Sequence, residues 1–206
     1  TMWELISAGG PAMWPIILCS VLAMGITLER AWTLQRSRVL PADLLPKVRR
    51  LLEAGSVSDE MLTALERNSP FGRVLAAGLA ARHRPRERML ERLQDAGRQV
   101  VHELDRFLNT LGTIASIAPL LGLLGTVTGI IRSFTAINQG AIGDPRLLSG
   151  GISEALITTA AGLMVAVPAL VAYRLLRGRV DALALELERE TIAFIDWLET
   201  REATRR

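Results

Sequence analysis

Three long stretches without a charged residue limit what this chain can fold into. They cover residues 5–28, 107–131 and 155–173. A helix needs about 20 predominantly apolar residues to cross the roughly 30 Å hydrocarbon core of a bilayer, and each stretch is near that length. Apolar residues make up 50% of the chain, and its mean hydropathy is +0.29. The sequence therefore predicts an all-α membrane protein with three transmembrane helices and long cytoplasmic helical extensions.

The first stretch could instead be a secretory signal peptide. Such a peptide has a basic segment before its apolar core and a small-residue cleavage site after it. Here the only preceding charge is Glu4, and Glu29 and Arg30 follow with no A-x-A site. We therefore expect an uncleaved membrane helix.

The lysine and arginine residues are distributed unevenly. Fifteen of the 24 lie between Arg30 and Arg106, two lie between the second and third stretches, and seven follow the third. Segments rich in these residues stay on the cytoplasmic side of a membrane. We therefore expect the N-terminus and the loop before the third span to lie outside, and the 30–106 segment and the C-terminal tail to lie inside.

This orientation gives a division of the chain into six parts. They are 1–33 for the outer N-terminus and first span, 34–106 for a cytoplasmic helical domain, 107–135 for the second span, 136–151 for an outer loop, 152–176 for the third span, and 177–206 for a cytoplasmic C-terminal helix.

The cytoplasmic domain is predicted to be helical throughout, because its apolar residues recur at helical spacing. Gly55 ends one helix, and Ser58 caps the next. Pro70 and Pro85 each open a further helix. No helix-breaking residue follows Pro85 before the second apolar stretch, so one continuous helix is predicted to run into the membrane. The tail repeats apolar residues between charges, which predicts an amphipathic helix.

The second and third stretches contain many small and polar residues. Gly125 and Gly129 form a GxxxG pair, which lets helices approach closely. We infer that these two spans line an interior, whereas the first faces lipid. Plain helix packing without a pore is about equally compatible with these features. The residues expected to pack closely, within a ring of subunits, are Gly122, Gly125, Gly129 and Gly162.

Glu154 stands at the outer edge of the third span and is the only acidic residue in any of the three spans or at their pore-facing ends. A carboxylate at the centre of a membrane helix costs about 2.5–3.5 kcal/mol, and less near the interface. Thr158 lies one turn deeper. Thr126 and Thr159 both lie roughly 7–9 Å below the outer edge of their helices, so a polar ring is plausible there. Threonines that bond their own backbone are the common alternative.

Other kinds of chemistry find little support. The tetrad Leu148-Ser149-Gly150-Gly151 is similar to a signature of ATP-binding-cassette ATPases, but the only lysine, Lys47, is in no glycine-rich loop. His83 and His102 form no paired metal-ligand motif. Cys19 is the only cysteine, so no internal disulfide is possible. We expect no enzyme activity, no metal, no cofactor and no nucleic-acid partner.

Two segments carry a family resemblance. Residues 122–134, GLLGTVTGIIRSF, and residues 151–170, GISEALITTAAGLMVAVPAL, closely resemble the MotA/TolQ/ExbB proton-channel family. The similarity is strong across about residues 106–180 and weaker in the cytoplasmic SPFGRVLAAGL segment. Three spans with an outer N-terminus fit the ExbB and TolQ branches, with ExbB favoured, and not the four-span MotA branch.

The resemblance implies a bacterial inner-membrane subunit with a periplasmic N-terminus. It implies a homo-oligomeric ring, expected to be a pentamer, around single-span ExbD-like helices that carry a proton-binding Asp. Motion would pass to a TonB-like protein for the import of iron-siderophores and vitamin B12. A TolQ-like subunit of the Tol-Pal system and a non-conducting membrane scaffold remain the alternatives.

The motif match puts Thr126, Glu154 and Thr159 at the family's pore positions. Thr158 stands where relatives often carry Ala, so it adds a hydroxyl to the same region. Glu154 could carry protons, or it could position the partner helix by polar contact.

The predicted topology can be tested by cysteine labelling from outside the cell. Ser58→Cys should react only after the membrane is permeabilised, because the charge bias puts residues 30–106 inside. Gly143→Cys should react in intact cells. The reverse pattern would exclude this orientation.

Overall fold

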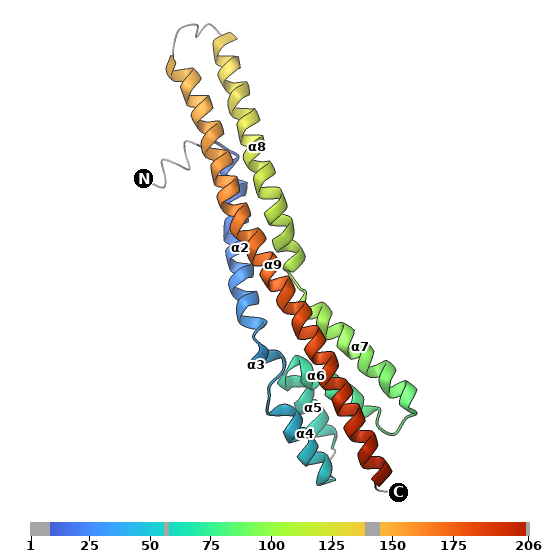
Figure 1. Cartoon of the computed structure of the whole chain (residues 1–206). Coiled ribbons are helices and arrows are strands. Elements are labelled where there is room, and N and C mark those ends of the chain that lie inside the picture. The colour runs from blue at the N-terminus through green and yellow to red at the C-terminus, as the bar shows by residue number, and fades with distance from the viewer. Residues whose placement is uncertain (1–8, 56–57, 139–144, 205–206) are drawn as a thin grey trace. The chain divides into compact units, whose positions relative to one another are not determined.

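The computed structural model describes residues 9–55, 58–138 and 145–204 (Figure 1). Gly143, the outer labelling position, lies outside these residues. Every regular element among the described residues is a helix, which confirms the all-α prediction. The helices are α2 (Met13–Thr33), α3 (Arg36–Val39), α4 (Leu44–Glu53), α5 (Asp59–Asn68), α6 (Pro70–Ala80), α7 (Arg86–Leu104), α8 (Leu108–Asn138) and α9 (Pro145–Thr204).

Three helical stretches are long and apolar enough to cross a membrane, as the sequence predicts. They are Met13–Thr33, Arg86–Thr135 and Ser149–Arg201. The chain forms two compact units. The first comes from the described parts of Thr1–Glu29 and Phe107–Leu175, and the second from those of Arg30–Arg106 and Leu176–Arg206. The described parts of the uncharged stretches 5–28, 107–131 and 155–173 belong to the first unit, whereas residues 86–106 and 176–201 belong to the second.

The prediction of one continuous helix from Pro85 into the membrane is wrong, because α7 ends at Leu104 and α8 begins at Leu108. Phe107, between the two helices, has a φ of 64°, which a side chain other than glycine rarely adopts. Arg30 Nη1 donates to the carbonyl oxygens of Glu103 (3.3 Å) and Leu104 (3.5 Å) at the end of α7. A buried arginine from another helix thus satisfies carbonyls that the break leaves without helical partners.

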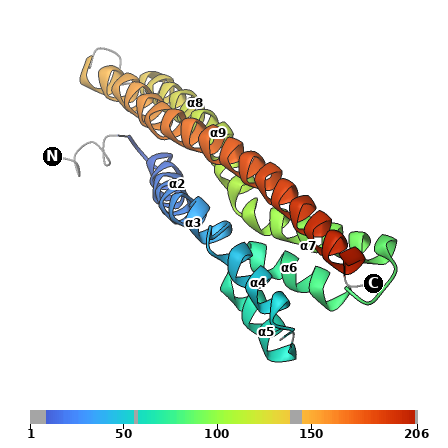
Figure 2. The ribbon, with the colours of Figure 1, turned by 60° about the horizontal axis from the view of Figure 1, so that its bottom comes forward.

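The third predicted span and the predicted C-terminal helix form one element, because α9 continues without interruption through Pro168 and Gly178. The amphipathic pattern of the tail is confirmed. The residues Val180, Leu183, Leu187, Phe194 and Leu198 are all buried. In the second unit, α7 runs beside this part of α9 (Figures 1 and 2), and Arg86 Nε lies 2.8 Å from Glu199 Oε1.

Helix α6 is the most enclosed element of the second unit, and its core side chains are Phe71, Val74, Leu75 and Leu79. Ser69 caps α6, because its Oγ accepts a hydrogen bond from Gly72 N (3.1 Å). Ser58 caps α5 in the same way through Met61 N (3.2 Å). The predicted cap at Ser58 and the stop at Gly55, where φ is 77°, are therefore confirmed.

A two-point ion pair joins α6 to the end of α7. Arg73 Nη1 and Nη2 donate to Glu103 Oε1 (2.6 Å) and Oε2 (2.5 Å). Parallel bonds of this kind are the stronger form of carboxylate pairing. The hydrogen bonds from Arg73 hold the pKa of Glu103 below its ordinary value of 4.5. A carboxylate whose pKa is lowered by folding stabilises the folded chain above its unfolded pKa, and this contribution is lost as the pH falls.

We therefore expect Glu103→Gln to lower the thermal midpoint of the detergent-solubilised protein at pH 7. The gap from the native chain should narrow as the pH falls below 4.5 and on through the lowered pKa of Glu103, where the native carboxylate also becomes protonated. Glu66→Gln, at an exposed position on α5, is the matched control. If the difference in thermal midpoint between Glu103→Gln and the native chain is the same at neutral and acidic pH, the ionised Glu103 does not stabilise the fold through Arg73.

Candidate functional site

Helices α8 and α9 lie side by side in the first unit (Figures 1 and 2). Gly112 faces Tyr173, Gly122 faces Thr159, and Gly129 faces Ala155. Increasing residue numbers on α8 are therefore matched by decreasing residue numbers on α9, so the two helices are antiparallel. Small residues occur at the contact on both helices, where close approach of backbones stabilises membrane helices.

The glycines of this contact have little or no room for a side chain. A Cβ on Gly122 would lie 3.1 Å from the carbonyl oxygen of Thr158, and one on Gly129 would lie 2.7 Å from that of Gly151. From the other helix, a Cβ on Gly162 would lie 2.6 Å from the carbonyl oxygen of Ala118. The sequence predicts close helix contacts at these glycines within a ring, and in the single chain they lie at the contact between α8 and α9.

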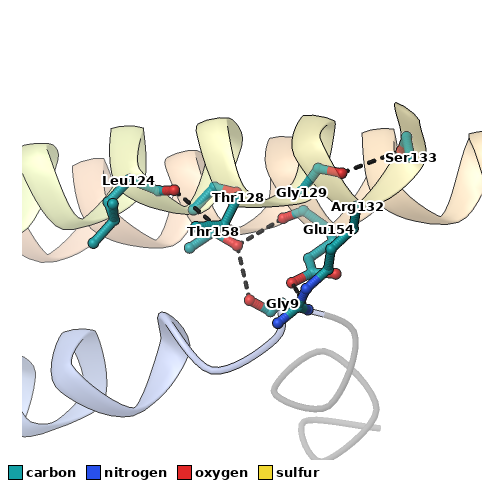
Figure 3. A network of polar contacts seen from close by, with 9 residues as sticks. Gly9, Leu124, Thr128, Gly129, Arg132, Ser133, Glu154 and Thr158 are labelled. Atoms are coloured by element: carbon teal, nitrogen blue, oxygen red, sulfur yellow. Dashed lines mark hydrogen bonds and ion pairs between the residues drawn. The ribbon is translucent and has the colours of Figure 1, made fainter. Parts of the chain in front are cut away.

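Glu154, near the end of this helix pair where α8 stops and α9 starts, forms an ion pair across the two helices (Figure 3). Its Oε1 lies 2.7 Å from Nη1 of Arg132 on α8. The Glu154 side chain is 15% exposed, and that of Arg132 is 53% exposed. Gly10 lies against the same carboxylate, has a φ of 66°, and has no space for a Cβ beside Glu154 Oε1.

Thr158 is completely buried between the two helices and the N-terminal segment. Its Oγ1 lies 2.6 Å from the main-chain oxygen of Glu154 and 2.9 Å from the main-chain oxygen of Gly9 (Figure 3). A hydroxyl has a single proton to donate, so the two carbonyls share it. Thr158 therefore ties the segment before α2 to α9.

Thr126 and Thr159 are partly exposed, and each donates its hydroxyl proton to a backbone carbonyl. Thr126 Oγ1 lies 2.6 Å from the oxygen of Leu123 in its own helix. Thr159 Oγ1 reaches across to the oxygen of Gly122, at 3.1 Å. With its proton used in this way, each hydroxyl oxygen keeps lone pairs that can accept a hydrogen bond.

Sequence reasoning missed Arg132 and the Gly9–Gly10 segment as parts of this cluster. It treated Arg132 only as the outer boundary of the second span. A usable signal was present, because the antiparallel depth comparison that matches Thr126 with Thr159 also brings Arg132 near Glu154. No comparable pattern indicates the contacts of Gly9 and Gly10, which depend on tertiary packing just before α2.

Large apolar side chains are exposed on all three membrane helices of the single chain. Examples are Leu18, Val21 and Met24 on α2, Leu120, Val127 and Phe134 on α8, and Leu156, Met164 and Val167 on α9. Surfaces of this kind are stable only against lipid or other protein. Within residues 9–55, 58–138 and 145–204, no group of three or more His, Cys, Asp or Glu residues is arranged to hold a metal ion.

The fold and the site define a three-span α-helical membrane protein whose second and third spans enclose a cluster of polar side chains. The model of the MotA/TolQ/ExbB proton channel family matches residues 66–189. The chain belongs to this family, and at that level it is a subunit of an inner-membrane proton channel.

Three relatives illustrate the similarity. A putative biopolymer transport protein ExbB-like 1 from Synechocystis is 38% identical over 176 residues, which cover 82% of this chain and 67% of the relative. The biopolymer transport protein exbB1 from Vibrio cholerae is 34% identical over 201 residues, which cover 92% and 85%. The Tol-Pal system protein TolQ from Haemophilus influenzae is 40% identical over 96 residues, which cover 47% and 40%.

The glycine contact predicts that Gly125→Leu will separate α8 from α9. A Cβ at Gly125 would already lie 2.6 Å from Thr158 Cβ, so the larger side chain must push the helices apart. Overpacking of this kind costs about 1–3 kcal/mol, so we expect a lower thermal midpoint and loss of the native oligomer by native mass spectrometry.

The matched control is Gly25→Leu on α2, because a Cβ at Gly25 meets nothing within 4 Å. Equal behaviour of the two variants would show that the tight contact at Gly125 does not limit stability.

Proposed function

We propose that this chain is an ExbB-like, ring-forming subunit that uses the proton motive force together with a single-span ExbD-like partner. In this proposal the ring is a homopentamer, its N-terminus is periplasmic, and it energises a TonB-like protein for outer-membrane import of iron-siderophores and vitamin B12. The observation that carries the proposal is that the polar residues Glu154, Arg132, Thr126 and Thr159 all lie on one close helix pair of a proton-channel family.

The chain's own acids support the need for a partner. None of the three apolar stretches contains a carboxylate, and Glu154 stands just before the third of them. A proton that crosses the hydrocarbon core needs a titratable group deeper than this, because a charge in that medium is costly. The missing carboxylate would come from the partner helix, in agreement with the single-span subunit that the family resemblance implies.

Thr126 and Thr159 are suited to meet such a carboxylate. Their hydroxyl protons are donated to the carbonyls of Leu123 and Gly122, which leaves oxygen lone pairs as acceptors. A protonated carboxyl group can donate to these oxygens, whereas a carboxylate cannot. We assign both threonines to the proton path. Thr158, which is fully buried, has a packing role in this proposal.

A TolQ-like role in the Tol-Pal system is the second candidate. The supporting observation is the 40% identity to the Haemophilus influenzae TolQ protein over 96 residues. The ExbB role is preferred because the similarity to exbB1 extends over 92% of this chain.

Proton flux in liposomes tests the proposal. The chain reconstituted with its ExbD-like partner should conduct protons down an imposed gradient, and the chain alone should not. Thr126→Val and Thr159→Val should each reduce the flux about tenfold or more, because Val keeps the shape and removes the acceptor oxygen.

Thr113→Val is the matched control, because Thr113 is exposed on α8 and its hydroxyl donates to Asn109 O. Absence of flux from the complete complex would favour a non-conducting scaffold. Full flux in the Thr126→Val, Thr159→Val double variant would make both threonines packing residues.

A further inference from the structure

The ion pair between Arg132 and Glu154 has no assigned task in the proton path described above. We propose that Arg132 is a positioning residue, which fixes the Glu154 carboxylate and thereby the register of α8 against α9. The two residues then act as one unit. This inference rests on the proposed function, because it deepens the account of the same site.

The exposure of the two side chains indicates which residue depends on the other. The Glu154 side chain is 15% exposed, so its carboxylate has lost most of its contact with solvent. An enclosed carboxylate is destabilised unless a counter-charge or hydrogen-bond donor replaces the lost water. Arg132 supplies both through Nη1 at 2.7 Å, and its own side chain stays 53% exposed. Glu154 therefore needs Arg132 more than Arg132 needs Glu154.

The other neighbours of the carboxylate cannot replace Arg132. Thr158 bonds the main-chain oxygen of Glu154, not its carboxylate. Gly10 has no side chain and closes the space beside Oε1. Among the residues that the structure describes, Arg132 is the one whose side chain is seen to bond the carboxylate (Figure 3).

The glycine contact leaves a role for such a pair at the end where α8 stops and α9 starts. Deeper along the two helices, Thr158 packs against Gly125, and Thr159 Oγ1 bonds Gly122 O, so side chains already help to set the register there. The ion pair adds a directional contact beyond these positions, and a charged pair across the contact favours one register. Thr126 and Thr159 lie a few residues further along the same two helices, so their relative position depends on that register.

A double-mutant cycle tests this inference. Arg132→Gln, Glu154→Gln and the double variant are reconstituted with the partner, and proton flux is measured beside pull-down of the partner. We expect each single variant to lose about tenfold in flux with the complex still assembled. The double variant should lose no more flux than either single variant, because the first substitution has already abolished the ion pair. Arg132→Lys should recover most of the flux, since an ammonium can still pair with the carboxylate.

Two results would overturn the inference. One is a double variant about a hundredfold weaker than wild type, which is the product expected of independent residues. The other is wild-type flux in Arg132→Gln, which would mean that Glu154 acts without its partner. The control is Arg88→Gln, which removes an exposed ion pair with Glu91 on α7 and should leave the flux unchanged.

The same four proteins separate this inference from the proposed function. If the wild-type complex carries no flux, the proposed function fails, and the coupling is then measured from the thermal midpoints alone. If the changes in thermal midpoint of the two single variants do not add up to that of the double variant, the positioning role of Arg132 is supported. If they do add up, it is refuted.

Discussion

The close approach of two helix backbones is the constraint on which the membrane unit depends. A Cβ at Gly129 or Gly162 would lie within 2.7 Å of a carbonyl oxygen on the facing helix. Such proximity places Thr159 Oγ1 within hydrogen-bonding distance of Gly122 O, and Arg132 within reach of Glu154. In lipid there is no hydrophobic driving force that brings apolar side chains together. Close backbone packing and polar contacts therefore have to stabilise the helix pair. The polar cluster is therefore a consequence of the glycines as much as of its own side chains.

The helical class and the three membrane stretches could be predicted from the sequence because they depend on local patterns of charge and hydropathy. The caps at Ser58 and Gly55 are equally local. The break between α7 and α8 could not be predicted in this way, because its carbonyls are satisfied by Arg30, more than 70 positions away in the chain. Proline and glycine are the usual signals of a helix end, and neither occurs at this break.

In the candidate site, too, features marked by a local sequence pattern could be predicted, and features that depend on tertiary packing could not. Glu154 and the threonines stand out because polar residues are conspicuous in apolar stretches. Arg132 does not, because an arginine at the end of a span reads as a boundary residue that reaches into the aqueous phase. Its role becomes visible only when both helices are seen together. The full burial of Thr158 is likewise a property of packing, since its neighbour Thr159 has the same chemistry and is partly exposed.

The position of the segment before α2 has a practical consequence for work with this protein. Gly9 O accepts from a buried threonine, and Gly10 touches the carboxylate of the site. An affinity tag or fluorescent protein joined close to Gly9 would therefore lie against the Glu154 end of the α8–α9 pair and could displace its contacts. A fusion of this kind that fails in uptake assays would report on the tag and not on the native chain. Labels intended to be silent belong elsewhere, for example at exposed Arg88 on α7.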